Sequence, residues 1–112
     1  MRADNIILGI AIAYFAWRFV SAWLVRRRLP ALMQEGAQLV DVRSAAEFAG
    51  GHVPGSVNIP LDEIGLRAKE LDSQKWVVVF CASGTRSALA RHKLKGLGFG
   101  KVLNAGSWRS LR

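Results

Sequence analysis

The only cysteine of the chain, Cys81, lies where a thiolate can be stabilised. It follows the apolar run 76–80, which predicts a strand buried on both faces, and it precedes a short polar loop. A helical pattern, residues 87–97, begins directly after this loop. Backbone N–H groups of such a loop and the first turn of such a helix favour an anion and lower a cysteine pKa. The pattern indicates a nucleophile, although a lone cysteine in an arbitrary chain is more often a buried structural residue.

The loop after the cysteine consists of small and polar residues with one arginine. Its members are Ala82, Ser83, Gly84, Thr85, Arg86 and Ser87. The planar guanidinium of Arg86 suits oxyanions of sulfur or phosphorus. Cysteine phosphatases carry a similar loop with the motif Cys-x5-Arg, which is one residue longer than the loop in this chain. The shorter loop forms a smaller cradle that fits one extra sulfur atom on Cys81 better than a tetrahedral phosphate, which disfavours a phosphatase or an arsenate reductase.

Further motifs occur in a fixed order around this loop. They are Asp41-Val42-Arg43, Glu47-Phe48, Gly51 to Pro60, and Asn104 to Trp108. With these blocks the chain resembles the single-domain rhodaneses, which are sulfurtransferases, over residues 38–108. The resemblance implies an α/β, three-layer fold with a central parallel sheet. It also implies that Cys81 takes sulfur from a sulfane donor, holds it as a persulfide and passes it to cyanide or a thiol, without a metal or an organic cofactor.

The loop departs from the family pattern immediately after the cysteine. Many thiosulfate-using members carry a basic residue there, whereas this chain has Ala82. Arg86 alone must then meet the negative charge of the donor. A protein persulfide or a low-molecular-weight persulfide is therefore as consistent with the sequence as thiosulfate. The alternative function is a non-catalytic rhodanese module that binds a partner or senses redox state, and it stays open at this point.

Asp41, Arg43, Glu47 and His52 are candidates for supporting roles outside the loop. Ser44 and Glu47 have the spacing of a capping box, which predicts a short helix after Ser44. We expect Arg43 and Glu47 to form an ion pair beside the start of that helix. Asp41 ends a predicted strand and could face the same edge of the sheet as the cysteine. His52, in a loop rich in glycine and proline, is more typical of a hydrogen-bonding clamp than of a general base.

The N-terminal segment, residues 6–25, is apolar except for Arg18 and Ser21 and is long enough to cross a bilayer as a helix. The side chain of Arg18 is long enough to snorkel toward the membrane interface. We expect a single-pass anchor, and the arginines at 26–28 predict that the domain is cytoplasmic. The alternatives are an interfacial helix, or a cleaved signal at residues 1–22 that would place the domain in the periplasm or outside the cell.

The net charge of +8 and the pI near 10.9 could suggest a nucleic-acid partner. The charge is concentrated, however, because five of the 16 basic residues lie within positions 1–28. The remaining basic residues are dispersed and have no aromatic platform between them, so nucleic-acid binding is disfavoured. Two histidines and one cysteine without ligand spacing disfavour a metal site. The expected partners are a sulfur donor, a sulfur acceptor and the membrane.

The chain divides into an anchor with a basic flank at residues 1–28, a linker at 29–37 and a rhodanese-like domain at 38–112. Leu29-Pro30 is expected to end the anchor helix, and Gly36 to end the short turn that follows. Strands are predicted at 38–42, 57–59, 76–80 and 101–103. Two longer helices are predicted between them. The inward residues are expected to be Ile64 with Leu66 or Leu71 in the first helix, and Ala88, Leu89, Leu94 and Leu97 in the second.

Overall fold

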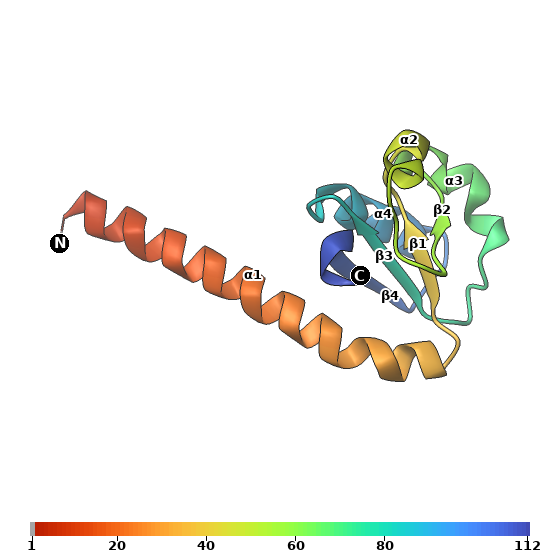
Figure 1. The fold of residues 1–112 in the computed structure, drawn as a ribbon, viewed down its shortest axis with the longest axis horizontal. Helices are drawn as coiled ribbons and strands as arrows, with labels where there is room; N and C mark the ends of the chain where they lie inside the picture. Colours follow the sequence, from red (N-terminus) through yellow and green to blue (C-terminus); the bar gives the residue numbers. More distant parts are fainter. Residues whose placement is uncertain (1) are drawn as a thin grey trace.

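The computed structural model describes residues 2–112 and has a four-stranded parallel sheet at its centre (Figure 1). The strands are β1 (Gln38–Asp41), β2 (Val57–Asn58), β3 (Val77–Cys81) and β4 (Val102–Ser107), in the order β2-β1-β3-β4. Every residue of β3 is buried, which accounts for its continuous apolar sequence. The predicted α/β fold with a central parallel sheet is confirmed.

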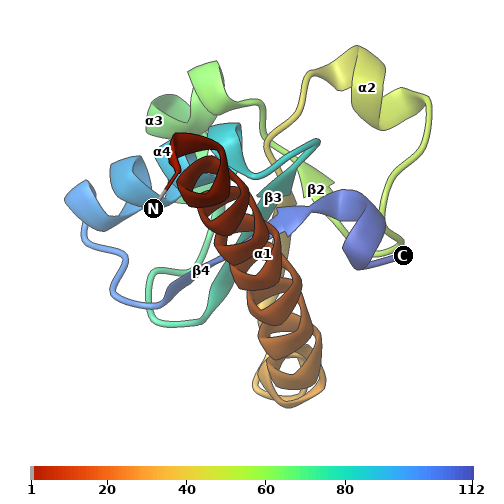
Figure 2. The same cartoon turned by 90° about the vertical axis from the view of Figure 1, so that its left-hand side faces the viewer.

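Helices cover the two faces of the sheet unequally. The alternation of side chains along β3 sends Val77, Val79 and Cys81 to one face, where they pack with α3 (Ile64–Arg67) and α4 (Thr85–Gly96). It sends Val78 and Phe80 to the other face, where they pack with the end of α1 (Ala3–Gln34) and with the 3-10 turn Trp108–Ser110. Figure 2 shows α1 crossing in front of this second face.

The short helix α2 (Ala45–Ala49) begins as the capping box predicts. The Ser44 hydroxyl accepts a hydrogen bond from the Glu47 N–H at 3.2 Å, and the Glu47 carboxylate accepts one from the Ser44 N–H at 3.0 Å. Two of the free N–H groups at this helix start are thereby satisfied. The capping box fixes the direction of the Glu47 side chain, which matters for the site described below.

The inward faces of the two later helices differ from the prediction. Residues 61–71 form two 3-10 turns around the short α3, with Ile64 buried, Leu71 half-buried and Leu66 80% exposed. In α4 the buried residues are Ser87, Ala90 and Leu94. The other apolar residues expected inward, Ala88, Leu89 and Leu97, are exposed. The loop before α4 turns Ser87 toward Cys81, and this rotation sets the face that the rest of the helix buries.

The first helix continues through Pro30 to Gln34, so the break expected at Leu29-Pro30 is wrong, and Gly36 follows with a φ of +85°. A proline removes one helical hydrogen bond, but Leu29 and Leu32 pack into the second core cluster and hold the helix together. The last part of α1 therefore belongs to the packed domain. The N-terminal part projects away from the domain (Figure 1).

One helix of the described chain, α1, is long and apolar enough to cross a membrane, with a mean hydropathy of 1.7 in its best window. It lies near the N-terminus, where a signal sequence has the same properties. Its large apolar side chains from Ile6 to Val20 are 47–69% exposed. This exposed apolar surface has the length and composition of a membrane span or of a signal sequence.

Candidate active site

Cys81 ends β3, and its side chain is fully buried beneath the loop that leads into α4. The Gly84 N–H donates a hydrogen bond to Cys81 Sγ at 2.9 Å, and Ser87 Oγ lies 3.5 Å from the same sulfur. Gly84 has a φ of +102°, and a Cβ there would lie 3.2 Å from Gly106 Cα. Both the backbone conformation and the close approach of β4 require glycine at this position. The loop is therefore a tight cradle around the sulfur.

The cradle shifts the protonation of the thiol. Burial alone would raise the pKa of Cys81, but hydrogen bonds from the Ser87 hydroxyl and from the N–H groups of Ser87, Ser83 and Gly84 together lower it below its ordinary value. The thiolate is the nucleophilic form of cysteine, so a lowered pKa makes the reactive form available closer to neutral pH. Ala82 is half-buried, while Ser83 and Thr85 are exposed on the outer rim of the loop.

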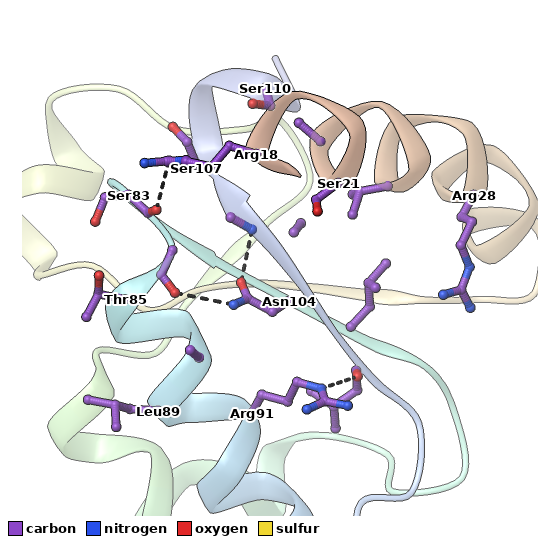
Figure 3. Close-up of a pocket in the computed structure, with 18 of the residues that line it drawn as sticks. Arg18, Ser21, Arg28, Ser83, Thr85, Leu89, Arg91, Asn104, Ser107 and Ser110 are labelled. Atoms are coloured by element: carbon purple, nitrogen blue, oxygen red, sulfur yellow. Dashed lines mark hydrogen bonds between the residues drawn. The ribbon is translucent and has the colours of Figure 1, made fainter. Parts of the chain in front are cut away.

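Asn104 supports the loop from β4, a role that the sequence analysis did not assign. Its Oδ1 lies 2.7 Å from Ser87 Oγ and accepts a hydrogen bond from the Gly106 N–H at 3.0 Å. Its Nδ2 donates to the Gly84 carbonyl at 3.3 Å (Figure 3). A signal for Asn104 was present, since it lies in the last motif block, near the end of the strand beside Cys81.

Glu47 and Arg86 form a bidentate ion pair across the site, with nitrogen–oxygen distances of 2.6 and 3.0 Å. The hydrogen bond with Arg86 is the main reason that the pKa of Glu47 falls to about 2. Glu47 in turn raises the pKa of Arg86, and the Cys81 thiolate adds to that rise. The Glu47–Arg86 pair thus joins the start of α2 to the loop that follows Cys81.

The predicted Arg43–Glu47 ion pair is wrong, because each residue has a different partner. Arg43 turns into the protein and binds Asp41, with Nη2 2.8 Å from Oδ2 and side chains 4% and 0% exposed. Glu47 is held by the capping box and points toward Arg86. The structure thus brings Glu47 to the cysteine loop and places Asp41 and Arg43 in a separate buried pair.

His52 lies in the loop that follows α2. Its ring stacks on Phe48 with centroids 3.9 Å apart, and its Nδ1 lies 3.0 Å from the Phe48 carbonyl oxygen. These contacts fit a clamp between the loop and the helix. The site-forming residues brought together by the structure are Cys81, the loop through Ser87, Glu47 and Asn104.

The helix α1 also reaches the loop, which the sequence analysis did not anticipate. The guanidinium of Arg18 donates a hydrogen bond to the Ser83 carbonyl at 3.4 Å, and Figure 3 shows the two residues facing each other. This contact joins the apolar N-terminal segment to the outer rim of the cysteine loop. No local pattern could predict it, because 65 positions separate the two residues.

Comparisons with known proteins identify the family of this chain. The family model described as the rhodanese-like domain matches residues 26–110. The putative sulfur carrier protein YrkF of Bacillus subtilis is 41% identical over 70 residues, covering 62% of this chain and 38% of that protein. The uncharacterized protein YqhL of the same species is 32% identical over 109 residues, covering 90% of this chain and 86% of its own length. The chain therefore spans well under half of the first relative and most of the second.

A solved structure also shares the fold. A human single-domain sulfurtransferase superposes with a TM-score of 0.66 and is 31% identical, covering 75% of this chain and 88% of that one. At this identity the likeness extends beyond topology to sequence.

Proposed function

This chain belongs to the rhodanese-like domain family and is a rhodanese-type sulfurtransferase, and we propose that its Cys81 carries the transferred sulfur as a persulfide. The observation that carries this proposal is the loop geometry around the sulfur. The Gly84 N–H approaches Sγ at 2.9 Å, Ser87 Oγ lies 3.5 Å away, and the pKa of Cys81 is lowered. A cradle of N–H and O–H donors stabilises both the attacking thiolate and a charged persulfide.

The proposed reaction has two displacements. The Cys81 thiolate attacks the outer sulfur of the donor, a bond forms between the two sulfurs, and the bond within the donor breaks. Thiosulfate would leave as sulfite, and a persulfide would leave as a thiolate. A thiolate or cyanide then attacks the terminal sulfur of the persulfide, which regenerates the Cys81 thiolate. Each step moves one sulfur atom and one electron pair, so no external oxidant or reductant is required.

The charge around the loop supports a persulfide donor at least as strongly as thiosulfate. Ala82 supplies no charge, and Arg86 is neutralised by Glu47 at 2.6 Å. Thiosulfate carries two negative charges and would have to compete with Glu47 for the guanidinium. The reacting group of a low-molecular-weight or protein persulfide carries at most one negative charge and makes a smaller demand on Arg86. We therefore propose that persulfides react at least as fast as thiosulfate.

Intact mass measurement tests the sulfur transfer. The purified full chain is incubated with thiosulfate or, separately, with glutathione persulfide. We expect a gain of one sulfur atom, about 32 Da, that cyanide reverses and that Cys81→Ser abolishes. Ser73→Ala, at an exposed serine outside the loop, serves as a matched control and should load normally. Transfer that survives Cys81→Ser would contradict the proposal, and failure of the wild type with both donors would favour the non-catalytic module.

We also propose that α1 anchors the enzyme in a membrane, with the domain on the cytoplasmic side. The exposed apolar surface of α1 and the arginines at positions 26–28 support this placement. The full chain should float with phosphatidylcholine vesicles and resist extraction with alkaline carbonate. A cleaved signal would instead appear as a shortened mature chain, and an interfacial helix would be released by carbonate. Either result would overturn the anchor without affecting the proposed chemistry of Cys81.

A further inference from the structure

A broad groove separates α1 from the surface formed by α4 and β4. Its volume is about 1080 Å³. Trp17 and Val25 contribute to its wall from α1, Leu89 from α4 and Leu103 from β4, while Trp76 lies next to them. Leu89 is 54% exposed, although the apolar pattern predicted it to be inward. The groove thus has an apolar lining that the protein itself leaves unfilled.

The charged residues of the groove all have the same sign. Its lining includes Arg18, Arg28, Arg91 and Lys95 and, among residues 2–112, no aspartate or glutamate. None of the four forms a salt bridge within the described chain. Figure 3 shows Arg28 and Arg91 toward one end of the groove and Arg18 toward the other, beside Ser83. An occupant that matches this lining has an anionic head and an apolar body.

The position of the groove along α1 identifies the source of such a molecule. Side chains of α1 are half-buried against the domain at Ser21, Ala22 and Val25, whereas nearly all residues from 3 to 20 are exposed. Residues 3–20 form about 27 Å of helix at a rise of about 1.5 Å per residue. This length is close to the ~30 Å hydrocarbon core of a bilayer. The groove begins at Tyr14, Trp17 and Arg18, so if residues 3–20 are inserted it starts beside the last two turns of the inserted segment and continues to Arg28 at the level of the lipid headgroups.

We propose that the groove between α1 and α4 binds an anionic phospholipid. Its phosphate lies among Arg28, Arg91 and Lys95, and an acyl chain extends along the apolar wall of α1. This inference rests on the membrane placement proposed above, since the lipid enters from the bilayer that surrounds α1. The outer wall of the groove includes Ser83, Gly84 and Thr85 of the cysteine loop. A bound anionic lipid therefore holds the cysteine loop against the membrane surface, where a membrane-bound donor or acceptor can reach it.

Quenching of Trp76 by brominated lipids tests this site directly, because Trp76 lies in the groove. The full chain carries Trp17→Phe and Trp23→Phe, so that the two tryptophans of α1 do not contribute. The same protein with the additional change Trp76→Phe retains only Trp108, and its fluorescence is subtracted to leave the signal of Trp76. Vesicles contain equal fractions of brominated phosphatidylglycerol or brominated phosphatidylcholine. We expect the anionic lipid to quench Trp76 at least about twofold more strongly than the neutral one.

A matched pair of variants separates binding in the groove from general attraction to a charged surface. Lys95→Glu changes a residue of the groove, whereas Lys93→Glu makes the same charge change on the same helix outside the groove. We expect Lys95→Glu to remove the preference for the anionic lipid and Lys93→Glu to retain it. Equal loss in both variants, or equal quenching by both lipids, would overturn the lipid site.

Flotation of the same samples distinguishes the two proposals. A protein that floats but shows no preferential quenching of Trp76 retains the membrane anchor and loses the lipid site, and an acidic protein segment would then be the better occupant of the groove. A protein that does not float loses both the anchor and the lipid site. Persulfide formation at Cys81 is measured separately and does not depend on either outcome.

Discussion

Two ion pairs connect the motifs of this chain, and they differ in burial. The Asp41 and Arg43 side chains are 0% and 4% exposed, whereas Glu47 and Arg86 are 38% and 36% exposed. Charges removed from water must be fully satisfied by hydrogen bonds, while half-exposed charges exchange partners at little cost. The comparison indicates that the first pair serves the architecture and the second can take part in substrate binding.

The buried pair joins separate parts of the family pattern. Arg43 donates two further bonds, from its backbone N–H to Asp41 at 2.9 Å and from Nη2 to the Gly51 carbonyl at 2.7 Å. Its guanidinium also lies 4.3 Å from the centre of the Trp108 ring. Asn58 donates to the backbone carbonyls of both Asp41 and Arg43. Three motif blocks that are distant in sequence therefore meet at one buried salt bridge.

The half-exposed pair has a different setting. It connects the start of α2 to the cysteine loop, whose Cys81 is fully buried. A donor whose negative charge binds Arg86 must share the guanidinium with Glu47 or draw it away from Glu47. Because both charges are partly solvated, this rearrangement costs far less than it would in the buried pair. Glu47 therefore competes with an anionic substrate for Arg86.

The largest expected effect is on the buried pair. Asp41→Ala leaves Arg43 buried without its counterion, and we expect a loss of about 3–5 kcal/mol in the free energy of unfolding. Chemical denaturation of the full chain in detergent measures this loss. Asp62→Ala, an exposed aspartate without a salt bridge in the described chain, is the control and should change stability by less than about 0.5 kcal/mol. Equal losses of stability in the two variants would contradict a structural role for the buried Asp41–Arg43 pair.

A smaller effect, on substrate preference, is expected at the half-exposed pair. Glu47→Gln retains the capping function but removes the charge that occupies Arg86. We expect the rate of Cys81 loading by thiosulfate to rise about two- to fivefold, and the rate with glutathione persulfide to change less. Both rates are measured by quenching the loading reactions at successive times and determining the fraction of persulfide-carrying protein by intact mass. A lower thiosulfate rate in this variant would show that Glu47 assists the donor instead of competing with it.

The sequence predicted correctly those features that depend on residues close together in the chain. The buried strand before Cys81, the loop and the capping box at Ser44 each depend on neighbouring residues, and all are present in the structure. The wrong prediction of an Arg43–Glu47 ion pair also has a local cause. Asp41 and Glu47 both lie within four positions of Arg43, so spacing alone could not decide between them. The direction of Arg43 is set by Gly51 and Trp108, which are remote in sequence.

Other features depend on packing that no local pattern contains. Helix α1 passes through Pro30 because Leu29 and Leu32 find partners on the sheet. Leu89 was expected inside, but it faces the groove between α1 and α4. Asn104 and Arg18 meet the cysteine loop only after β4 and α1 are in place. In each case the missing information is a contact between distant segments.

The smallest expected effect is the response of the half-exposed pair to acid. The folded pKa of Glu47 is about 2, below its ordinary value of 4.5, so its ionised form stabilises the fold above pH 4.5. This contribution should disappear as the pH falls from 4.5 toward 2, and because Glu47 is half-exposed it should amount to less than about 1 kcal/mol. Glu47→Gln lacks the titrating carboxyl. The difference in unfolding free energy between wild type and Glu47→Gln, measured in one detergent across this range, should therefore narrow with acidification. A constant or widening difference would mean that Arg86 does not hold the Glu47 carboxylate in solution, and the contrast between the two pairs would then rest on burial alone.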